Sequence, residues 1–491
     1  MAESRLLADG FAPSARGFFM VFSSVTFLFY FLPAFLISYF AMPGVRTKNL
    51  VLLAFSLVFY AWGGLANVAV LAVSIVANYG FALLIDRQQP RGRLRMLGLA
   101  VAANLAGLIA FKYAGFLAEN LNILLEPTGL SLPVVHLALP LGISFFTFHA
   151  ISYLVDVYRR KARANGRFEE IAVYITMFPQ LVAGPIVRYS TIAHRIRNRR
   201  TTLGRVSAGL RIFVIGLSWK VLIADQVAPI VAAVFDETAV PNLAEAWLGV
   251  TAYALQIYFD FGGYSNMAIG LALAMGLKFP RNFDLPYGAL SITDFWRRWH
   301  MSLSSWFRDY VYIPLGGNRR GHVHTALNLW TVFLLCGLWH GASWTFVIWG
   351  IHHGTFLVLE RTRLGAALKA GPRLIGHAYV LLVVLSGWVW FRANGLDEAL
   401  TLFESLVGLN GTGPLSVKLS SQLAPLTIAV MVIGWPLAMF GLPQPGAGRM
   451  PAKVRSLLYA TSDTVVVALL YTLCILSVAA ATYSPFLYFR F

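Results

Sequence analysis

Residues 325–350, TALNLWTVFLLCGLWHGASWTFVIWG, form an apolar segment long enough to cross a membrane, and they carry a histidine at position 340. A stretch near or above about 18 apolar residues predicts a transmembrane helix. If that helix begins near Thr325, His340 lies about 22 Å along it, at 1.5 Å per residue. The hydrocarbon core is about 30 Å thick. An ionisable side chain at such a depth indicates a functional site.

The rest of the chain has the composition of a membrane protein. Of its 491 residues, 58% are hydrophobic and 12% are charged, whereas soluble chains are about 45–50% apolar and about 25% charged. Further apolar runs begin at Met20 (MVFSSVTFLFYFLPAFLISYF), at Val68 and at Leu381. We therefore predict an all-α polytopic membrane protein with roughly 11–13 membrane helices.

The positive charges indicate how the chain is oriented. The formal net charge is +18, and the basic residues gather in short connectors that begin at Asp86, Arg159 and Arg188. The positive-inside rule places these connectors in the cytoplasm. Because three predicted spans precede the first connector, we expect the N-terminus on the outer, periplasmic side of the inner membrane. No separate basic face is present, so nucleic-acid binding is not expected.

One membrane domain is predicted, covering residues 20–491. Residues 1–19, MAESRLLADGFAPSARGFF, are a mixed polar leader without a signal-peptide core. We interpret them as an N-terminal extension, either a short outward tail or a stretch that is not native. The remaining chain has no tandem repeat and no linker long enough to separate domains.

Three stretches are too polar or too broken to be simple spans. They are FPQLVAGPIVRY (178–189), YFDFGGYSNMAIG (258–270, with Asp260) and DFWRRWHMSLSSWFRDYVYIPLGGNRRG (294–321). Irregular backbone at membrane depth is tolerated only inside protein or beside a water-filled cavity. We therefore expect re-entrant or interfacial helices around a central funnel.

The stretch 294–321 is amphipathic when placed on a helix. One face would carry aromatic and small side chains, and the other would carry arginines: Phe295, Trp299, Ser302, Trp306 and Tyr310 against Arg297 and Arg308. His300 would lie at the flank, and Pro314 with the following glycines would end the helix and present Asn318, Arg319 and Arg320. Such a helix suits a surface anchor along the membrane interface. The alternative is that it forms the rim of a buried site.

Two histidines are the strongest candidates for chemistry. A histidine titrates near neutral pH, so it can take a proton from a hydroxyl and return one to a leaving group. His340 and His300 could divide the roles of base and orienting group, with Trp339 beside His340. No cysteine or carboxylate set accompanies the other histidines, so we expect no metal site. The sequence has no G-x-S-x-G, P-loop or G-x-G-x-x-G motif, which disfavours hydrolases, ATP-driven pumps and dinucleotide enzymes.

In their order along the chain, the three irregular stretches and GLWHGASWTFVIWG resemble the membrane-bound O-acyltransferase (MBOAT) superfamily. The similarity is greatest to its bacterial branch of alginate O-acetylation and teichoic-acid D-alanylation proteins, and it extends from MVFSSVTFLFYFLP to SPFLYFRF. The resemblance implies a catalytic histidine at His340 and a supporting one at His300. One stretch departs from the pattern: DFSGYSDMAIG is expected, but DFGGYSNMAIG is present. Asn266 is therefore given no acid–base role, and Asp260 only a structural or gating one.

The resemblance also implies substrates and partners. It suggests a cytoplasmic acyl donor, acetyl-CoA or a similar thioester with no bound cofactor, and an extracytoplasmic polysaccharide acceptor. It further implies a periplasmic acetyltransferase partner, besides the surrounding lipids. Arg297, Arg308, Arg319 and Arg320 would hold donor phosphates, or would anchor the chain at the membrane surface. A transporter with His300, His340 and Asp260 as a proton relay is the alternative from another class, and a non-catalytic scaffold subunit is a third.

Overall fold

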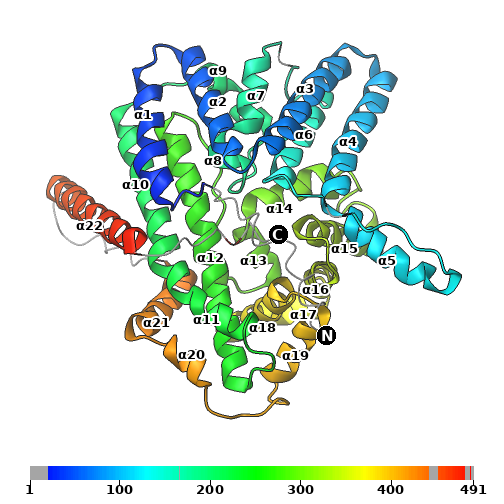
Figure 1. Ribbon diagram of the computed structural model, residues 1–491, viewed down its shortest axis with the longest axis vertical. Coiled ribbons are helices and arrows are strands. Elements are labelled where there is room, and N and C mark those ends of the chain that lie inside the picture. Colours follow the sequence, from blue (N-terminus) through cyan, green and yellow to red (C-terminus); the bar gives the residue numbers. More distant parts are fainter. Residues whose placement is uncertain (1–19, 136, 165, 442–451, 481–486, 488–491) are drawn as a thin grey trace.

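The computed structural model describes residues 20–135, 137–164, 166–441, 452–480 and 487, with the side chains of 452–463 left aside. Most of these residues are helical, and none of them is in a strand. The predicted extension 1–19 lies outside them. The all-α polytopic prediction is confirmed (Figure 1). Four helical segments are long and apolar enough to cross a membrane: 65–87, 90–112, 203–235 and 373–392. Shorter apolar helices accompany them, and the total number of crossings stays a prediction.

The N-terminal part of the chain forms the upper half of the molecule in Figure 1. Its elements are η2 (Thr26–Phe31), α1 (Leu32–Ala41), α2 (Val45–Ala61), α3 (Leu65–Arg87), α4 (Pro90–Lys112), α5 (Ala114–Leu125), η3 (Glu126–Thr128), α6 (Ile143–Tyr158), α7 (Phe168–Thr176), α8 (Phe178–Leu181) and α9 (Tyr189–Arg197). The basic connector between α3 and α4 and the basic helix α9 lie at the same end of the molecule, as the positive-inside pattern requires.

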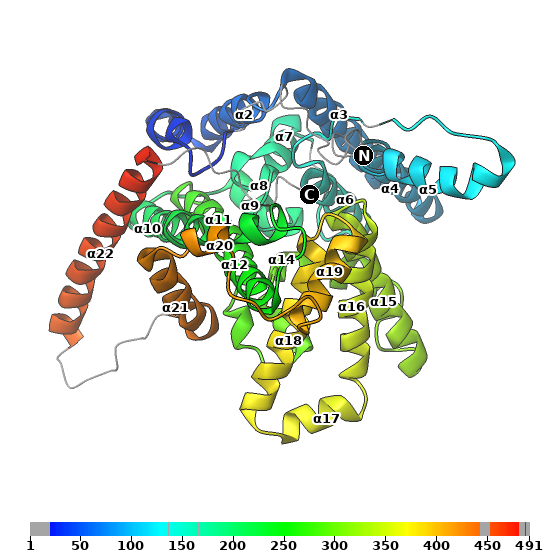
Figure 2. The ribbon, with the colours of Figure 1, turned by 60° about the horizontal axis from the view of Figure 1, so that its bottom comes forward.

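The middle of the chain supplies the central helices. They are α10 (Leu203–Trp219), η4 (Lys220–Ala224), α11 (Asp225–Phe235), α12 (Leu243–Ala274), η5 (Pro286–Gly288), α13 (Ile292–Arg298), α14 (Met301–Phe307) and η6 (Arg308–Tyr312). The C-terminal part completes the bundle with α15 (Gly321–His340), α16 (Trp344–Leu359), α17 (Arg363–Ala370), α18 (Arg373–Arg392), α19 (Leu396–Leu406), α20 (Val417–Ser421), α21 (Pro425–Phe440) and α22 (Ala452–Ala480). In Figure 2, α5 and α22 project from opposite sides of this bundle.

Helix α12 is the central helix of the fold. It has 32 residues, about 48 Å at 1.5 Å per residue, and most of its side chains are buried. Asn242 caps its start, because the Asn242 side chain accepts hydrogen bonds from the backbone N–H groups of Ala244 and Glu245. Residues 258–270 are therefore regular helix, and the prediction of an irregular segment there was wrong.

The glycines that suggested irregular backbone instead allow two helices to touch. A Cβ on Gly216 of α10 would lie 2.5 Å from the carbonyl oxygen of Gly263 of α12, and the same holds in reverse at 2.6 Å. Gly209 and Gly270 repeat this contact seven residues away along each helix. Small residues at such seams let helix backbones approach closely, which stabilises helix pairs inside membranes.

The apolar segment 325–350 is a hairpin, not a single span. Helix α15 ends at His340, and α16 begins at Trp344 and packs antiparallel to it. The two helices touch where a Cβ on Gly337 would lie 2.2 Å from the Phe346 carbonyl oxygen, and one on Gly350 2.4 Å from that of Phe333. His340 therefore stands at the turn of a tight hairpin.

The irregularity predicted for residues 178–189 is confirmed, since only the four-residue helix α8 precedes non-helical backbone up to Arg188. The stretch 294–321 is broken too, but its aromatic side chains are buried: Phe295, Trp296, Trp299 and Trp306 are all at most 7% exposed. The surface-anchor interpretation was therefore wrong for the aromatic face of this stretch, which lies in the interior, whereas most residues from 313 to 321 are exposed.

The glycine seam generates a stability prediction. Replacing Gly216 by Ala puts a methyl group against the Gly263 carbonyl, and overpacking of this kind costs roughly 1–3 kcal/mol. We expect G216A to lower the thermal midpoint measured by size-exclusion chromatography in detergent. G107A is the matched control, because a Cβ on Gly107 of α4 meets nothing within 4 Å. Equal midpoints for the two variants would contradict the close contact.

Candidate active site around His300 and His340

His340 ends α15 with its ring inside an aromatic enclosure. Its ring centroid lies 4.8 Å from that of Trp339, 5.2 Å from that of Trp349 and 5.0 Å from that of Phe391. The residue is 5% exposed. Enclosure by apolar rings keeps water away from the imidazole and strengthens electrostatic interactions inside the site.

His300 lies at the break between α13 and α14. Its backbone has φ 43° and ψ 53°, the left-handed region that non-glycine residues rarely occupy. Such strain persists only where surrounding contacts impose it, and it clusters at functional sites. Here the contacts are hydrogen bonds: Nδ1 of His300 is 3.1 Å from Oδ1 of Asn282, and the backbone N–H of Met301 donates to the Asn282 carbonyl at 2.9 Å.

Asn282 also fixes the protonation pattern of the His300 ring. The backbone N–H of Ser302, which can only donate, donates to Oδ1 of Asn282 at 3.3 Å, so Oδ1 is the acceptor facing His300 and Nδ2 donates to the Ser265 hydroxyl at 2.9 Å. The Ser302 hydroxyl donates to the same Oδ1 at 2.8 Å. Nδ1 of His300 therefore carries the ring proton, and the lone pair lies on Nε2. His300 is 1% exposed.

Trp339 joins the two histidines. Its ring centroid is 4.8 Å from that of His340 and 6.3 Å from that of His300. Phe148 stacks on the Trp339 ring at 5.2 Å, and Trp306 stacks on Phe148 at 3.9 Å. The structure thus brings together the three residues that the sequence singled out for the centre, along one aromatic wall.

The other predicted site residues lie elsewhere. Arg297, Asn318 and Arg319 are exposed, and Asn318 accepts a hydrogen bond from the Tyr312 hydroxyl. Asp260 is buried in α12, where its carboxylate lies 2.8 Å from Nζ of Lys220 and accepts from the Leu487 backbone N–H at 2.8 Å. Asp260 therefore has a buried ionic partner, and the structural or gating role expected for it stays a prediction.

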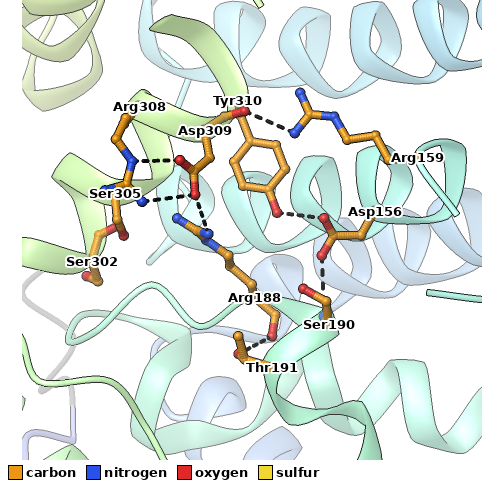
Figure 3. Close-up of polar contacts among 10 residues, drawn as sticks. All are labelled: Asp156, Arg159, Arg188, Ser190, Thr191, Ser302, Ser305, Arg308, Asp309 and Tyr310. Carbon is orange, nitrogen blue, oxygen red and sulfur yellow. Dashed lines mark hydrogen bonds and ion pairs between the residues drawn. The ribbon is translucent and has the colours of Figure 1, made fainter. Parts of the chain in front are cut away.

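Arg308 belongs to a charged cluster that includes residues of α6 and of the segment before α9 (Figure 3). The carboxylate of Asp309 lies 2.7 Å from Nε of Arg308 and 2.6 Å from Nη1 of Arg188. Burial raises the pKa of Asp309, but the hydrogen bond from Arg308 and the charge of Arg188 outweigh it, so this pKa lies below its usual value. The carboxylate therefore stays ionised at neutral pH.

The same cluster ties η6 to α6. Arg159 donates to the Asp309 carbonyl at 3.0 Å, and the Tyr310 hydroxyl donates to Asp156 at 2.9 Å. Nη2 of Arg188 is buried and has no hydrogen-bond partner among the described residues. The guanidinium groups thus keep capacity for an anion, while their present partners fix the position of η6.

A separate cavity of about 780 Å³ lies between the start of the described chain and α11. Asp225, Asp236, Gln256 and Arg392 are among its lining residues, which do not include either histidine. Within the described residues, no group of three or more His, Cys, Asp or Glu side chains is arranged to hold a metal ion.

Sequence reasoning missed Asn282 and Phe391. Asn282 lies 18 residues before His300 in a connector without periodicity, and Phe391 comes from α18, far along the chain. The one sequence signal available for Asn282 was that it is a polar residue between two apolar stretches. Nothing in the sequence pattern distinguishes Phe391 from other apolar residues of its helix.

Comparisons with known proteins identify the family of the chain. The model of the MBOAT, membrane-bound O-acyltransferase family matches residues 137–366, which contain both histidines. The probable alginate O-acetylase AlgI of Azotobacter vinelandii is 41% identical over 96% of this chain and 100% of its own length. The peptidoglycan O-acetyltransferase of Helicobacter pylori is 38% identical over 81% of both chains.

A more distant relative is the teichoic acid D-alanyltransferase of Streptococcus thermophilus, 30% identical over 45% of this chain and 56% of its own. The similarity to the first two relatives extends well beyond the histidine region, over most or nearly all of the chain. The chain belongs to the membrane-bound O-acyltransferase family and is an O-acyltransferase of the membrane.

Proposed function

We propose that this O-acyltransferase moves an acetyl group from a cytoplasmic thioester, such as acetyl-CoA, towards an extracytoplasmic polysaccharide such as alginate, with His340 as general base. The observation that carries the proposal is the pair of buried histidines whose rings both lie near Trp339, within the region matched by the family model. The acetyl group and the polysaccharide class are suggested by the names of the alginate and peptidoglycan relatives.

The proposed reaction needs one proton acceptor. The imidazole of His340 takes the proton from an acceptor hydroxyl as the oxygen attacks the thioester carbonyl carbon. A new C–O bond forms, and the C–S bond breaks as the tetrahedral intermediate collapses. The imidazolium then returns the proton to the leaving sulfur, which departs as a thiol. The reaction balances without an added oxidant, reductant or metal.

His300 has the orienting role. Because its Nδ1–H is directed to Asn282, its Nε2 is the hydrogen-bond acceptor of the ring. We propose that Nε2 orients the acceptor hydroxyl toward the thioester. The aromatic wall of Trp339, Phe148 and Trp306 would exclude water, which otherwise hydrolyses the thioester.

The charged cluster of Figure 3 suits the donor side. Guanidinium groups bind phosphate bidentately, and Arg308 and Arg188 lie in or beside the basic connectors that the positive-inside rule places in the cytoplasm. We propose that this cluster holds the donor phosphates. Arg297, Arg319 and Arg320 are exposed and would contribute by attraction at longer range.

The proposed setting is the bacterial inner membrane, with the N-terminus in the periplasm and lipids around the apolar helices. A periplasmic acetyltransferase would be the partner that receives the acetyl group and passes it to the polymer. The rival proton-relay transporter requires Asp260 to exchange protons with the histidines. Its ion pair with Lys220 and its bond to the Leu487 N–H argue against that role.

Removal of His340, the proposed general base, should nearly abolish acetyl transfer. General-base catalysis contributes about 10²- to 10⁴-fold, and we expect H340A to lose activity on that scale while inserting normally into the membrane. H352Q is the matched control, because His352 in α16 bonds the Val383 carbonyl and lies outside the proposed machinery. Polymer acetylation at the wild-type level in H340A would refute the assignment.

The Asn282–His300 hydrogen bond should act as a unit. We expect N282L and H300Q each to reduce kcat about tenfold, since general acid–base groups must be oriented to be effective. The kcat of the double variant should be only slightly lower than that of either single variant, because each substitution removes the same oriented His300 ring. Multiplicative losses, measured as kcat with purified enzyme, would show that the two residues act independently.

The donor-phosphate role of Arg308 can be separated from chemistry. We expect R308A to raise the KM for acetyl-CoA about tenfold, the loss of one charge-assisted hydrogen bond, with kcat unchanged. S-acetyl-N-acetylcysteamine, a thioester without phosphate, should react equally well with variant and wild type. R281A is the control, since Arg281 is also an exposed arginine paired with an acid, Asp284. A rise in KM for both donors would contradict phosphate binding.

A further inference from the structure

Two helix ends meet beside the proposed base. Helix α4 ends at Lys112 and α15 ends at His340, and these residues are 228 positions apart in the chain. Nζ of Lys112 donates hydrogen bonds to the carbonyl oxygens of Trp339 and His340, each at 2.7 Å. Tyr113, the next residue, donates its hydroxyl to the Leu338 carbonyl.

These contacts complete the hydrogen bonding at the end of α15. The last four carbonyls of a helix have no partner in a further turn of that helix. Here the Gly341 N–H donates to the Gly337 carbonyl at 3.3 Å. The side chains of Tyr113 and Lys112 supply the donors for the next three carbonyls, those of residues 338–340. In a membrane, where water is scarce, each unsatisfied carbonyl would cost several kcal/mol.

The backbone holds this end only through the Gly341 N–H, at 3.3 Å from the Gly337 carbonyl. Gly341 leaves the helix with φ −161° and ψ 155°, which is extended backbone, so no later turn of α15 supplies a donor to the His340 carbonyl. The His340 ring is confined by aromatic neighbours, but its backbone carbonyl is held by the Lys112 ammonium. A cation also suits this place, because the C-terminal end of a helix carries partial negative charge.

A second cation on the same helix shows the same geometry away from His340. Arg93 of α4 is buried, and its guanidinium donates to the carbonyls of Val157 and Tyr158, at 2.9 and 3.2 Å. These are the last two residues of α6. Helix α4 thus supplies donors to the C-terminal carbonyls of two helices: α6, which carries no proposed base, and α15, which ends at the proposed base His340. Variants of Arg93 and of Lys112 therefore allow a structural role to be compared directly with a positioning role.

We propose that Lys112 is a positioning residue for acyl transfer, which holds the end of α15 so that His340 stands at reaction distance from the acceptor hydroxyl. The inference rests on the proposed function of His340. Tyr113 assists by holding the preceding carbonyl. Catalytic groups must be placed within a fraction of an ångström, and a misplacement of about 1 Å can reduce rate about 10²-fold.

The test uses the full chain, purified with its lipids, and measures acetyl-CoA turnover. We expect K112M, which has similar length but no donor, to lose roughly 10- to 100-fold in kcat with the KM for acetyl-CoA unchanged. K112R keeps donors for both carbonyls and should recover most of the loss. Ethylammonium added to K112A should restore part of kcat, because it replaces the missing ammonium.

R93M is the matched control. It removes a similar pair of carbonyl contacts from the same helix, so we expect a lower thermal midpoint with kcat within about twofold of wild type. Equal losses of kcat in R93M and K112M, or an unchanged kcat in K112M, would overturn the positioning role. If K112M does not accumulate in the membrane, Y113F carries the same prediction with a smaller loss, about threefold to tenfold, and an unchanged kcat in Y113F would then overturn it.

The outcomes also separate this inference from the proposed function. Wild-type protein that turns over acetyl-CoA, alongside an H340A variant that does not, supports the proposed function whatever Lys112 does. In that case, a fully active K112M refutes only the positioning role. If the wild-type protein itself releases no thiol from acetyl-CoA, the proposed function and the positioning role both fall.

Discussion

The scarcity of water inside a membrane is the constraint on which this structure depends. Every polar group placed among apolar helices needs a partner from the protein itself. The site follows from this requirement. Asn282 provides a hydrogen-bond partner for the His300 ring, and Lys112 provides donors for the backbone carbonyls of Trp339 and His340. The buried carboxylate of Asp260 is matched by Lys220 in the same way. These polar groups therefore form connected sets, and each set fixes the geometry of the segment that carries it.

The histidine pair results from two interruptions of helical structure. His300 lies where α13 gives way to α14, and His340 where α15 turns into α16. Side chains at such ends can approach each other more closely than side chains on the faces of two straight helices. The Trp339 ring lies near both and stacks on Phe148, which stacks in turn on Trp306. The enclosure is thus built from backbone irregularity and large apolar rings. The sequence indicated the break near His300, but it did not indicate the turn at His340.

Sequence patterns predicted the fold class, because hydropathy is a local signal, and they singled out His300, His340 and Trp339, which the structure places near one another. They failed where the deciding partner is distant in the chain. The glycines of 258–270 indicated broken backbone, but they lie against glycines of α10 some fifty positions earlier and leave α12 regular. The aromatic face of 294–321 indicated an interface, yet it packs inward on residues of α6 and α15. Lys112 gave no signal at all, since its role depends on carbonyls 227 and 228 positions away.

The most direct test of the central claim is the position of the donor. Electron cryo-microscopy of the protein with a non-hydrolysable thioether analogue of acetyl-CoA would locate the acetyl group. The account predicts that this group lies beside Trp339, between His300 and His340, with the phosphates near Arg308 and Arg188. An acetyl group bound instead in the cavity lined by Asp225, Asp236 and Arg392, away from both histidines, would contradict it.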